Sequence, residues 1–176
     1  LTLFNYFDWL RDDNDDPDRW DTLREARPAS VDFWWRSSPA PLVPRADSGP
    51  VPPRVDFEDP VHSTPGMVRL RLDLDGNVFA FEAVPPRVGG AADGFEPFDW
   101  SRLFAVAGLD MAAFTPVEPR FTPAGFADTR AAWEGAWPTG LEAPLRIEAA
   151  AWRGRPVSWV VFSPWRPLEQ DPRPAG

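Results

Sequence analysis

Residues 67–84 read MVRLRLDLDGNVFAFEAV, and this stretch decides the fold class. Apolar and polar residues alternate on both sides of Asp75-Gly76, a dipeptide favoured in two-residue hairpin turns. Because register and hydrophobic pattern agree, the stretch is predicted to form an antiparallel hairpin. The expected pairs are Leu74 with Asn77, Leu72 with Phe79, Leu70 with Phe81 and Val68 with Ala83. The last three pairs share one face, and Arg69, Arg71, Asp73 and Glu82 lie on the other.

A second hairpin is predicted over residues 145–162, around the dipeptide Arg153-Gly154. A two-residue turn there sets Trp152 opposite Arg155 and Glu148 opposite Trp159. The other face then carries small apolar residues that would let a helix approach closely, so we expect it to be core. Its members are Leu145, Ile147, Ala149, Ala151, Val160 and Phe162.

Helices and shorter strands are predicted around the two hairpins. Apolar side chains recur at helical spacing in residues 1–27, where an acidic stretch interrupts the pattern and Asp16-Pro17 resembles a helix start. Asp99 can cap a helix that Gly108 ends. Strands are expected over 31–36, 114–118 and 129–137, and a proline-rich crossing over 39–65.

The two halves of the chain follow the same order of elements. Trp20-x-x-Leu23 and Trp100-x-x-Leu103 begin equivalent helices, and each half ends in a hairpin, which suggests a duplication of roughly 80 residues. We therefore predict an α+β fold of two degenerate tandem α+β repeats. In this fold, antiparallel sheets built from hairpins carry helices on one face. The repeats would span residues 1–88 and 89–176.

The composition excludes several classes of protein. The chain has 176 residues and a net charge of −9, which suits one domain or two small packed ones and makes a nucleic-acid partner unlikely. Absence of cysteine excludes disulfides, thiol nucleophiles and zinc–thiolate sites. No apolar run approaches the roughly 18 residues of a membrane span. Ten Trp and 13 Phe nevertheless indicate a folded core.

Tryptophans are the most informative residues for function. Aromatic side chains beside arginine are typical of binding hot spots, because Trp stacks on ligands and on cations. We therefore predict a ligand-binding surface formed by Trp133, Trp137, Trp152, Arg155 and Trp159. The alternative, favoured by the usual burial of aromatic residues, is that these rings form a second layer of core between the halves.

No catalytic or metal-binding constellation is predicted. His62, the single histidine, lies in the proline-rich crossing and is expected to be a solvated loop residue. Asp12-x-Asn14-x-Asp16 resembles the start of a calcium loop, but Pro17 stands where that loop needs glycine. Glu134, Glu142 and Glu148 are the candidate acids for glycoside hydrolysis, although their spacing establishes no pair. We expect no metal and no cofactor.

Three long stretches resemble one region of certain bacterial membrane serine/threonine protein kinases. They are DPDRWDTLREARPASVDFWWRSSPAPLVP (16–44), VHSTPGMVRLRLDLDGNVFAFEAVPP (61–86), and the segments DWSRLFAVAGLDMAAFTPVEPRFTP, ADTRAAWEGAWP and LRIEAAAWRGRPV (between 99 and 157). The resemblance covers residues 16–157, and in that family the region lies outside the kinase domain, next to membrane spans. It implies an extracytoplasmic accessory or sensory region on the bacterial inner membrane, anchored only through flanking segments. The glycine-rich loop and the catalytic and metal-binding Asp of a kinase are absent from this sequence.

The sequence therefore favours a non-catalytic sensory or interaction module of a membrane-anchored kinase, with an unknown extracellular ligand or protein partner. A free-standing, secreted, inhibitor-like protein-binding module is the alternative. A carbohydrate-active enzyme that uses Glu134 or Glu148 is the third hypothesis.

Overall fold

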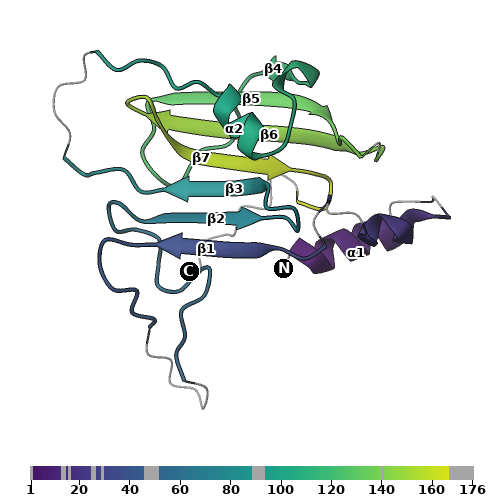
Figure 1. Cartoon of the computed structure of the whole chain (residues 1–176), viewed down its shortest axis with the longest axis horizontal. Coiled ribbons are helices and arrows are strands. Elements are labelled where there is room, and N and C mark those ends of the chain that lie inside the picture. The colour runs from purple at the N-terminus through teal and green to yellow at the C-terminus, as the bar shows by residue number, and fades with distance from the viewer. Residues whose placement is uncertain are drawn as a thin grey trace.

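The fold is built on one seven-stranded antiparallel sheet, in the order β1-β2-β3-β7-β6-β5-β4 (Figure 1). The strands are β1 (Phe33–Ser37), β2 (Val68–Leu72), β3 (Val78–Ala83), β4 (Thr115–Val117), β5 (Thr129–Ala136), β6 (Pro144–Trp152) and β7 (Arg155–Phe162). The computed structural model describes residues 2–12, 15, 17–24, 27–28, 30–45, 52–88, 94–139 and 141–166, with the side chains of 2–4 excepted. The predicted antiparallel sheet built from hairpins is confirmed. The described fold is mostly β, with few helices.

The hairpin of β2 and β3 has the predicted pairs Leu70–Phe81 and Val68–Ala83. The prediction for its turn is wrong. Asp73 N–H donates to the Asn77 carbonyl at 3.0 Å, so the loop has three residues, and its last residue, Gly76, has φ +81°. Leu72 therefore pairs with Val78, and a bulge restores the predicted register beyond it.

The hairpin of β6 and β7 has the predicted two-residue turn, with Trp152 opposite Arg155. The predicted pairing of Glu148 with Trp159 is wrong, because a bulge in β7 shifts the register by one residue. Trp159 pairs with Ala149, and Glu148 pairs with Val160. Since neighbouring residues of a strand face opposite ways, this shift moves Trp159 to the face that carries Ile147.

Two α-helices and two short 3₁₀ helices accompany the sheet. They are α1 (Thr2–Asp12), η1 (Arg19–Arg24), α2 (Ser101–Val106) and η2 (Met111–Ala113). Near the start of α2, the Asp99 carboxylate accepts from the Ser101 N–H at 3.1 Å, and Gly108 follows the helix with φ +60°. The end at Gly108 was predicted, whereas the residue at the cap position of the start is Trp100 rather than Asp99. Of the described helices, none has the length and apolar character to cross a lipid bilayer.

The main core lies between α2 and the sheet. Phe104 of α2 makes edge-to-face contacts with Trp133 of β5 at 5.2 Å and with Trp159 of β7 at 5.1 Å. We call this side of the sheet the α2 face. The other buried members of the cluster are Ala107, Phe114, Leu145, Ile147, Ala149 and Val161.

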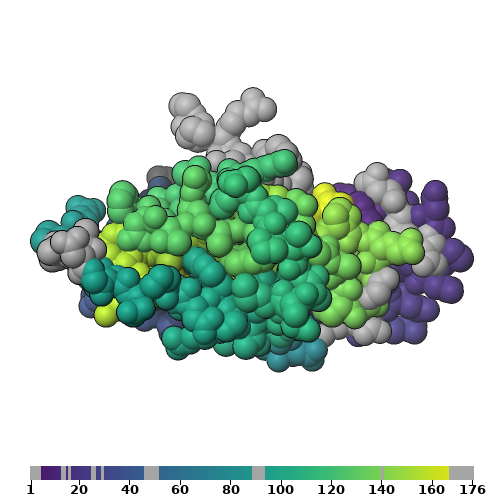
Figure 2. Space-filling view, turned by 90° about the horizontal axis from the view of Figure 1, so that it is seen from above, coloured from purple at the N-terminus to yellow at the C-terminus, as the bar shows by residue number. Residues whose placement is uncertain are grey.

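A second apolar cluster joins α1 to the last turn of the described chain. Tyr6 and Leu10 of α1 are fully buried there, together with Ala143 and Trp165. In the view from above, α1 lies at one end of the molecule rather than over the sheet (Figure 2). The predicted placement of helices on one face of the sheet therefore holds for α2 but not for α1.

The two predicted halves contribute adjoining strands to the same sheet. β1, β2 and β3 form one antiparallel run, β5, β6 and β7 form another, and β3 pairs with β7 between them. Some predictions fall outside the described residues. The helix start at Asp16-Pro17 and the stretch Asp12-x-Asn14-x-Asp16 lie partly there, as does the end of the chain from residue 167.

Candidate functional site

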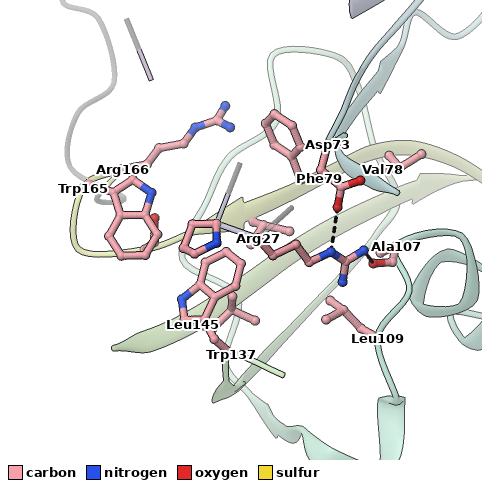
Figure 3. A pocket seen from close by; sticks show the side chains of 13 residues that line it. Arg27, Asp73, Val78, Phe79, Ala107, Leu109, Trp137, Leu145, Trp165 and Arg166 are labelled. Atoms are coloured by element: carbon pink, nitrogen blue, oxygen red, sulfur yellow. Dashed lines mark hydrogen bonds and ion pairs between the residues drawn. The ribbon is translucent and has the colours of Figure 1, made fainter. Parts of the chain in front are cut away.

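A small cavity lies where the α1 cluster meets the sheet and the end of α2 (Figure 3). Its volume is about 50 Å³, enough for a carboxylate-sized group or a few ordered waters. It is lined by apolar rings and chains together with three charged side chains. The lining residues are Arg27, Pro28, Asp73, Val78, Phe79, Ala107, Leu109, Trp137, Leu145, Val161, Ser163, Trp165 and Arg166.

The floor of the cavity is an ion pair between Arg27 and Asp73. Arg27 Nε donates to Asp73 Oδ2 at 2.6 Å, and its Nη atoms donate to the carbonyls of Ala107 and Gly108. Asp73 Oδ1 accepts from the Asp75 and Asn77 N–H groups inside the hairpin turn. Arg27 therefore ties the C-terminal carbonyls of α2 to the β2–β3 turn, and both ions have their partners within the protein.

One wall of the cavity consists of stacked tryptophans. The rings of Trp137 and Trp165 lie 5.5 Å apart with an interplanar angle of 24°. Trp165 also contacts Tyr6 at 4.7 Å and Trp9 at 4.9 Å, so this wall is continuous with α1. In Figure 3 the two tryptophans lie at one side of the cavity, and the Arg27 side chain runs across it towards Asp73 and Ala107.

Two buried donors in the lining have no acceptor among the described residues. They are the indole Nε1 of Trp137 and the Nη1 of Arg166. Burial lowers the pKa of Arg166, as does the nearby Arg71 charge, while Glu82 and Asp32 oppose this effect. A buried donor without an acceptor costs roughly 1–3 kcal/mol, so the site favours a group that brings acceptors.

The five residues predicted to bind ligand do not come together. Trp133 and Trp159 are 3% and 0% exposed and belong to the core beneath α2, whereas the alternative placed them in a layer between the halves. Contact with a ligand at either ring would require α2 to move. Only Trp137 lies at the cavity described above.

Trp152 and Arg155 lie instead at the tip of the β6–β7 hairpin. The guanidinium of Arg153 sits over the Trp152 ring at 4.7 Å, and Arg155 lines an open hollow against α2. Gly154 is required at this tip, because its φ is +69° and a Cβ there would lie 2.3 Å from the Glu96 carbonyl oxygen. The hairpin tip and the aromatic cavity are therefore separate places on the molecule.

The candidate acids for hydrolysis are held by one arginine. Arg146 reaches Glu134 and Glu148, each at 2.6 Å, and Glu148 also accepts from the Arg120 N–H at 3.0 Å. Burial opposes the Arg146 charge, but the hydrogen bonds that Arg146 donates to the two carboxylates outweigh it and raise the pKa of Arg146. Glu142 is exposed and lies just before β6 begins. Glu134 and Glu148 are therefore paired with the same guanidinium.

His62 is not the solvated residue that the sequence predicted. It is half-buried, and both ring nitrogens lie out of solvent. Burial and the neighbouring Arg69 charge lower the pKa of His62. Within the described ranges, no group of three His, Cys, Asp or Glu side chains is placed to hold a metal ion.

Sequence reasoning missed the aromatic cavity. The Arg27–Asp73 pair joins residues that are distant in the chain. Two features of the sequence could have indicated the cavity: the adjacent Trp165 and Arg166, and the acidic Asp73 beside the hairpin turn. No family model, curated protein or solved structure matches the chain.

Proposed function

We propose that this chain is a non-catalytic sensory or interaction module of a membrane-anchored bacterial serine/threonine protein kinase, and that its ligand site is the cavity between Trp137, Trp165 and Arg166. The observation that carries the ligand site is that two residues of the cavity lining, Trp137 and Arg166, hold buried donors without acceptors among the described residues. A small carboxylate with a short apolar group would supply acceptors to the guanidinium and the indole.

The position of the cavity supports a sensory role. Its tryptophan wall is shared with α1, whose Tyr6 and Leu10 are buried against Trp165. A ligand in the cavity would stabilise the arrangement in which α1 is docked on the sheet. A ligand that binds the docked arrangement more tightly than the undocked one shifts the equilibrium towards it, and this shift can carry a signal.

The kinase association rests on the resemblance of residues 16–157. In that family the corresponding region is extracytoplasmic and flanks membrane spans, which agrees with an acidic, aromatic-rich domain. Reading the coding sequence on both sides tests this part. An apolar span before residue 1, with kinase motifs further upstream, is expected. A signal peptide directly before it and a stop after residue 176 would favour the free-standing binding module.

A titration with simple carboxylates tests the ligand site. Acetate, butyrate and benzoate are added at constant ionic strength, while tryptophan fluorescence and the midpoint of thermal unfolding are followed. Binding to the folded state should raise the midpoint and change the emission of Trp137 and Trp165. Arg166→Met should abolish both responses.

The matched control is Arg130→Met, because Arg130 is exposed and, among the described residues, donates to the Phe121 carbonyl alone. This variant should respond like the wild type. An equal response in both variants, or no response in the wild type, would remove the cavity as a carboxylate site.

We further propose that residues 1–88 and 89–176 are degenerate repeats. The support is the placement of two three-strand runs, β1–β3 and β5–β7, whose last strands pair antiparallel as a two-fold arrangement requires. Peptides 1–88 and 89–176, mixed after separate expression, should reassemble with native tryptophan emission. Failure of the two peptides to associate would argue against two folding units.

A further inference from the structure

The two edges of the sheet differ in how they are protected. β4 has three residues with Pro116 in its centre, which is a usual device for blocking further strand pairing. β1 has five residues and no proline, and Phe33, Trp34 and Trp35 are 56%, 45% and 50% exposed. Among the described residues, backbone hydrogen bonds join β1 to β2 on one side only. β1 is thus an open, aromatic edge.

β1 also carries a buried charge that lacks a carboxylate. Arg36 is 9% exposed, its Nη atoms donate to the carbonyls of Asp56 and Pro60, and its Nε has no partner. Within the described residues, no acidic side chain makes an ion pair with it. A buried guanidinium is stabilised when a carboxylate is added beside it.

The sequence of β1 is complementary to itself when it runs antiparallel. Residues 32–36 read DFWWR. If two copies pair with Trp34 opposite Trp34, then Phe33 lies opposite Trp35 and Asp32 lies opposite Arg36, each twice. Cross-strand neighbours have Cβ atoms about 4.5–5.5 Å apart, so Asp32 would supply the carboxylate that Arg36 lacks. Asp32 already accepts from Arg71 through Oδ2 at 3.0 Å, which leaves Oδ1 to accept from Arg36 of the second copy.

Neighbouring registers are poorer. Residues that lie opposite each other must point to the same side of the sheet. A residue's partner can therefore change only by two positions, which moves the centre of the pairing by one residue. Centring on Trp35 places Trp34 opposite Arg36, and centring on Phe33 places Asp32 opposite Trp34. Both leave Asp32 and Arg36 apart.

We infer that two copies of this chain associate through antiparallel pairing of their β1 edges, centred on Trp34, into one continuous sheet. The occupant of the open edge is a second copy, because the charge pattern and the aromatic pattern of β1 both match β1 itself. The interface is isologous, as in most closed dimers. This inference does not depend on the aromatic cavity, none of whose lining residues belongs to β1.

Sedimentation equilibrium tests the association. The wild type should show twice the chain mass of 19.7 kDa, and Trp34→Lys, which sets two cations against each other on the two-fold axis, should sediment at 19.7 kDa. The matched control is Trp20→Lys, because Trp20 is similarly exposed at 43% but lies in η1. It should remain dimeric. Circular dichroism checks that each variant is folded.

Disulfide trapping tests the register, since the native chain has no cysteine. Trp34→Cys alone should form a crosslinked dimer on mild oxidation, because residues directly opposite lie within the Cα separation of a disulfide. Phe33→Cys alone and Trp35→Cys alone should not crosslink, whereas their mixture should. A wild type that stays monomeric at its highest soluble concentration overturns the dimer, and crosslinking of Phe33→Cys alone overturns the register.

Discussion

The two ends of the sheet use aromatic residues in opposite ways. At the β5–β7 end, Trp133 and Trp159 lie on the α2 face and are covered by Phe104. At the β1–β3 end, Trp35 lies on the same face, because it pairs with Leu70, which pairs with Phe81 and so with Trp159. Trp35 is nevertheless 50% exposed, and no described helix lies in front of this end (Figure 1).

The difference shows that aromatic content alone does not separate core from interface. Trp133 of β5 and Trp159 of β7 are part of the core because the six-residue helix α2 covers them. The rings of β1 remain between 45% and 56% exposed, although Phe57 contacts Trp34 edge-on, and so they stay available for association. We therefore expect substitutions at the covered end to reduce stability and substitutions at the open end to reduce association.

The largest effect is expected from the matched tryptophans of the two ends. Trp159→Ala removes a fully buried ring and should lower the free energy of unfolding by about 3–5 kcal/mol. Trp35→Ala removes a half-exposed ring and should cost about 1 kcal/mol. Urea unfolding of dilute protein measures both. Equal losses would mean that the open face is a core surface whose covering lies outside the described residues.

Breaking the tie between α2 and the open end should have the next largest effect. Arg27→Met leaves the buried Asp73 carboxylate without its cation, and breaking such a pair costs about 3 kcal/mol. Arg24→Met is the control, because Arg24 pairs with Asp21 in full exposure and its loss should cost about 0.5 kcal/mol or less. Chemical denaturation of both variants measures the two losses in the free energy of unfolding. A loss below 1 kcal/mol for Arg27→Met would show that Asp73 is satisfied by its turn alone.

Adding a methyl group to the core at the covered end should also lower the stability of the protein. A Cβ at Gly135 would lie 2.6 Å from Phe114 Cδ1, so Gly135→Ala should cost about 1–3 kcal/mol by overpacking. At Gly125 the nearest atom to an added Cβ is 3.6 Å away, and Gly125→Ala should be close to neutral. Thermal unfolding compares the two. A neutral Gly135→Ala would mean that Phe114 is free to move and that the β5 core is looser than described.

The smallest expected effect is a pH dependence at the open end. Burial and Arg69 lower the pKa of His62 below 6.5, with Arg36 acting in the same direction and Glu82 opposing. The unfolded chain then binds more protons than the folded one near and below pH 6.5. Stability is therefore fully present above pH 6.5 and is lost as the pH falls towards the folded pKa. His62→Gln should flatten this slope in urea unfolding between pH 7 and 5, and an unchanged slope would assign it to other groups.

The sequence predicted most strands and the turn of the second hairpin, because alternation and turn chemistry are local. It did not predict the side of the sheet on which Trp159 lies. One extra residue in β7 reverses every side chain beyond it, and nothing in the alternation marks that bulge. The same limit applied at Phe79, where the predicted partner Leu72 pairs with Val78 instead.

The candidate site was harder to predict than the fold. Arg27 meets Asp73 and α2, and Trp137 meets Trp165 and α1, through contacts between distant parts of the chain. Of the predicted binding residues only Trp137 lies at the cavity, because cross-strand register and helix coverage decide which rings are buried. Neither quantity is encoded in local periodicity.

Amide hydrogen exchange at two protein concentrations tests the account most directly. Amides of β6 and β7 beneath α2 should exchange slowly at both concentrations, since they open only on global unfolding. The outward-facing amides of β1 should exchange quickly in dilute protein and slow down at high concentration, as β1 pairs with a second copy. Exchange in β1 that is equally slow at both concentrations would contradict the claim that this edge is open and used for association.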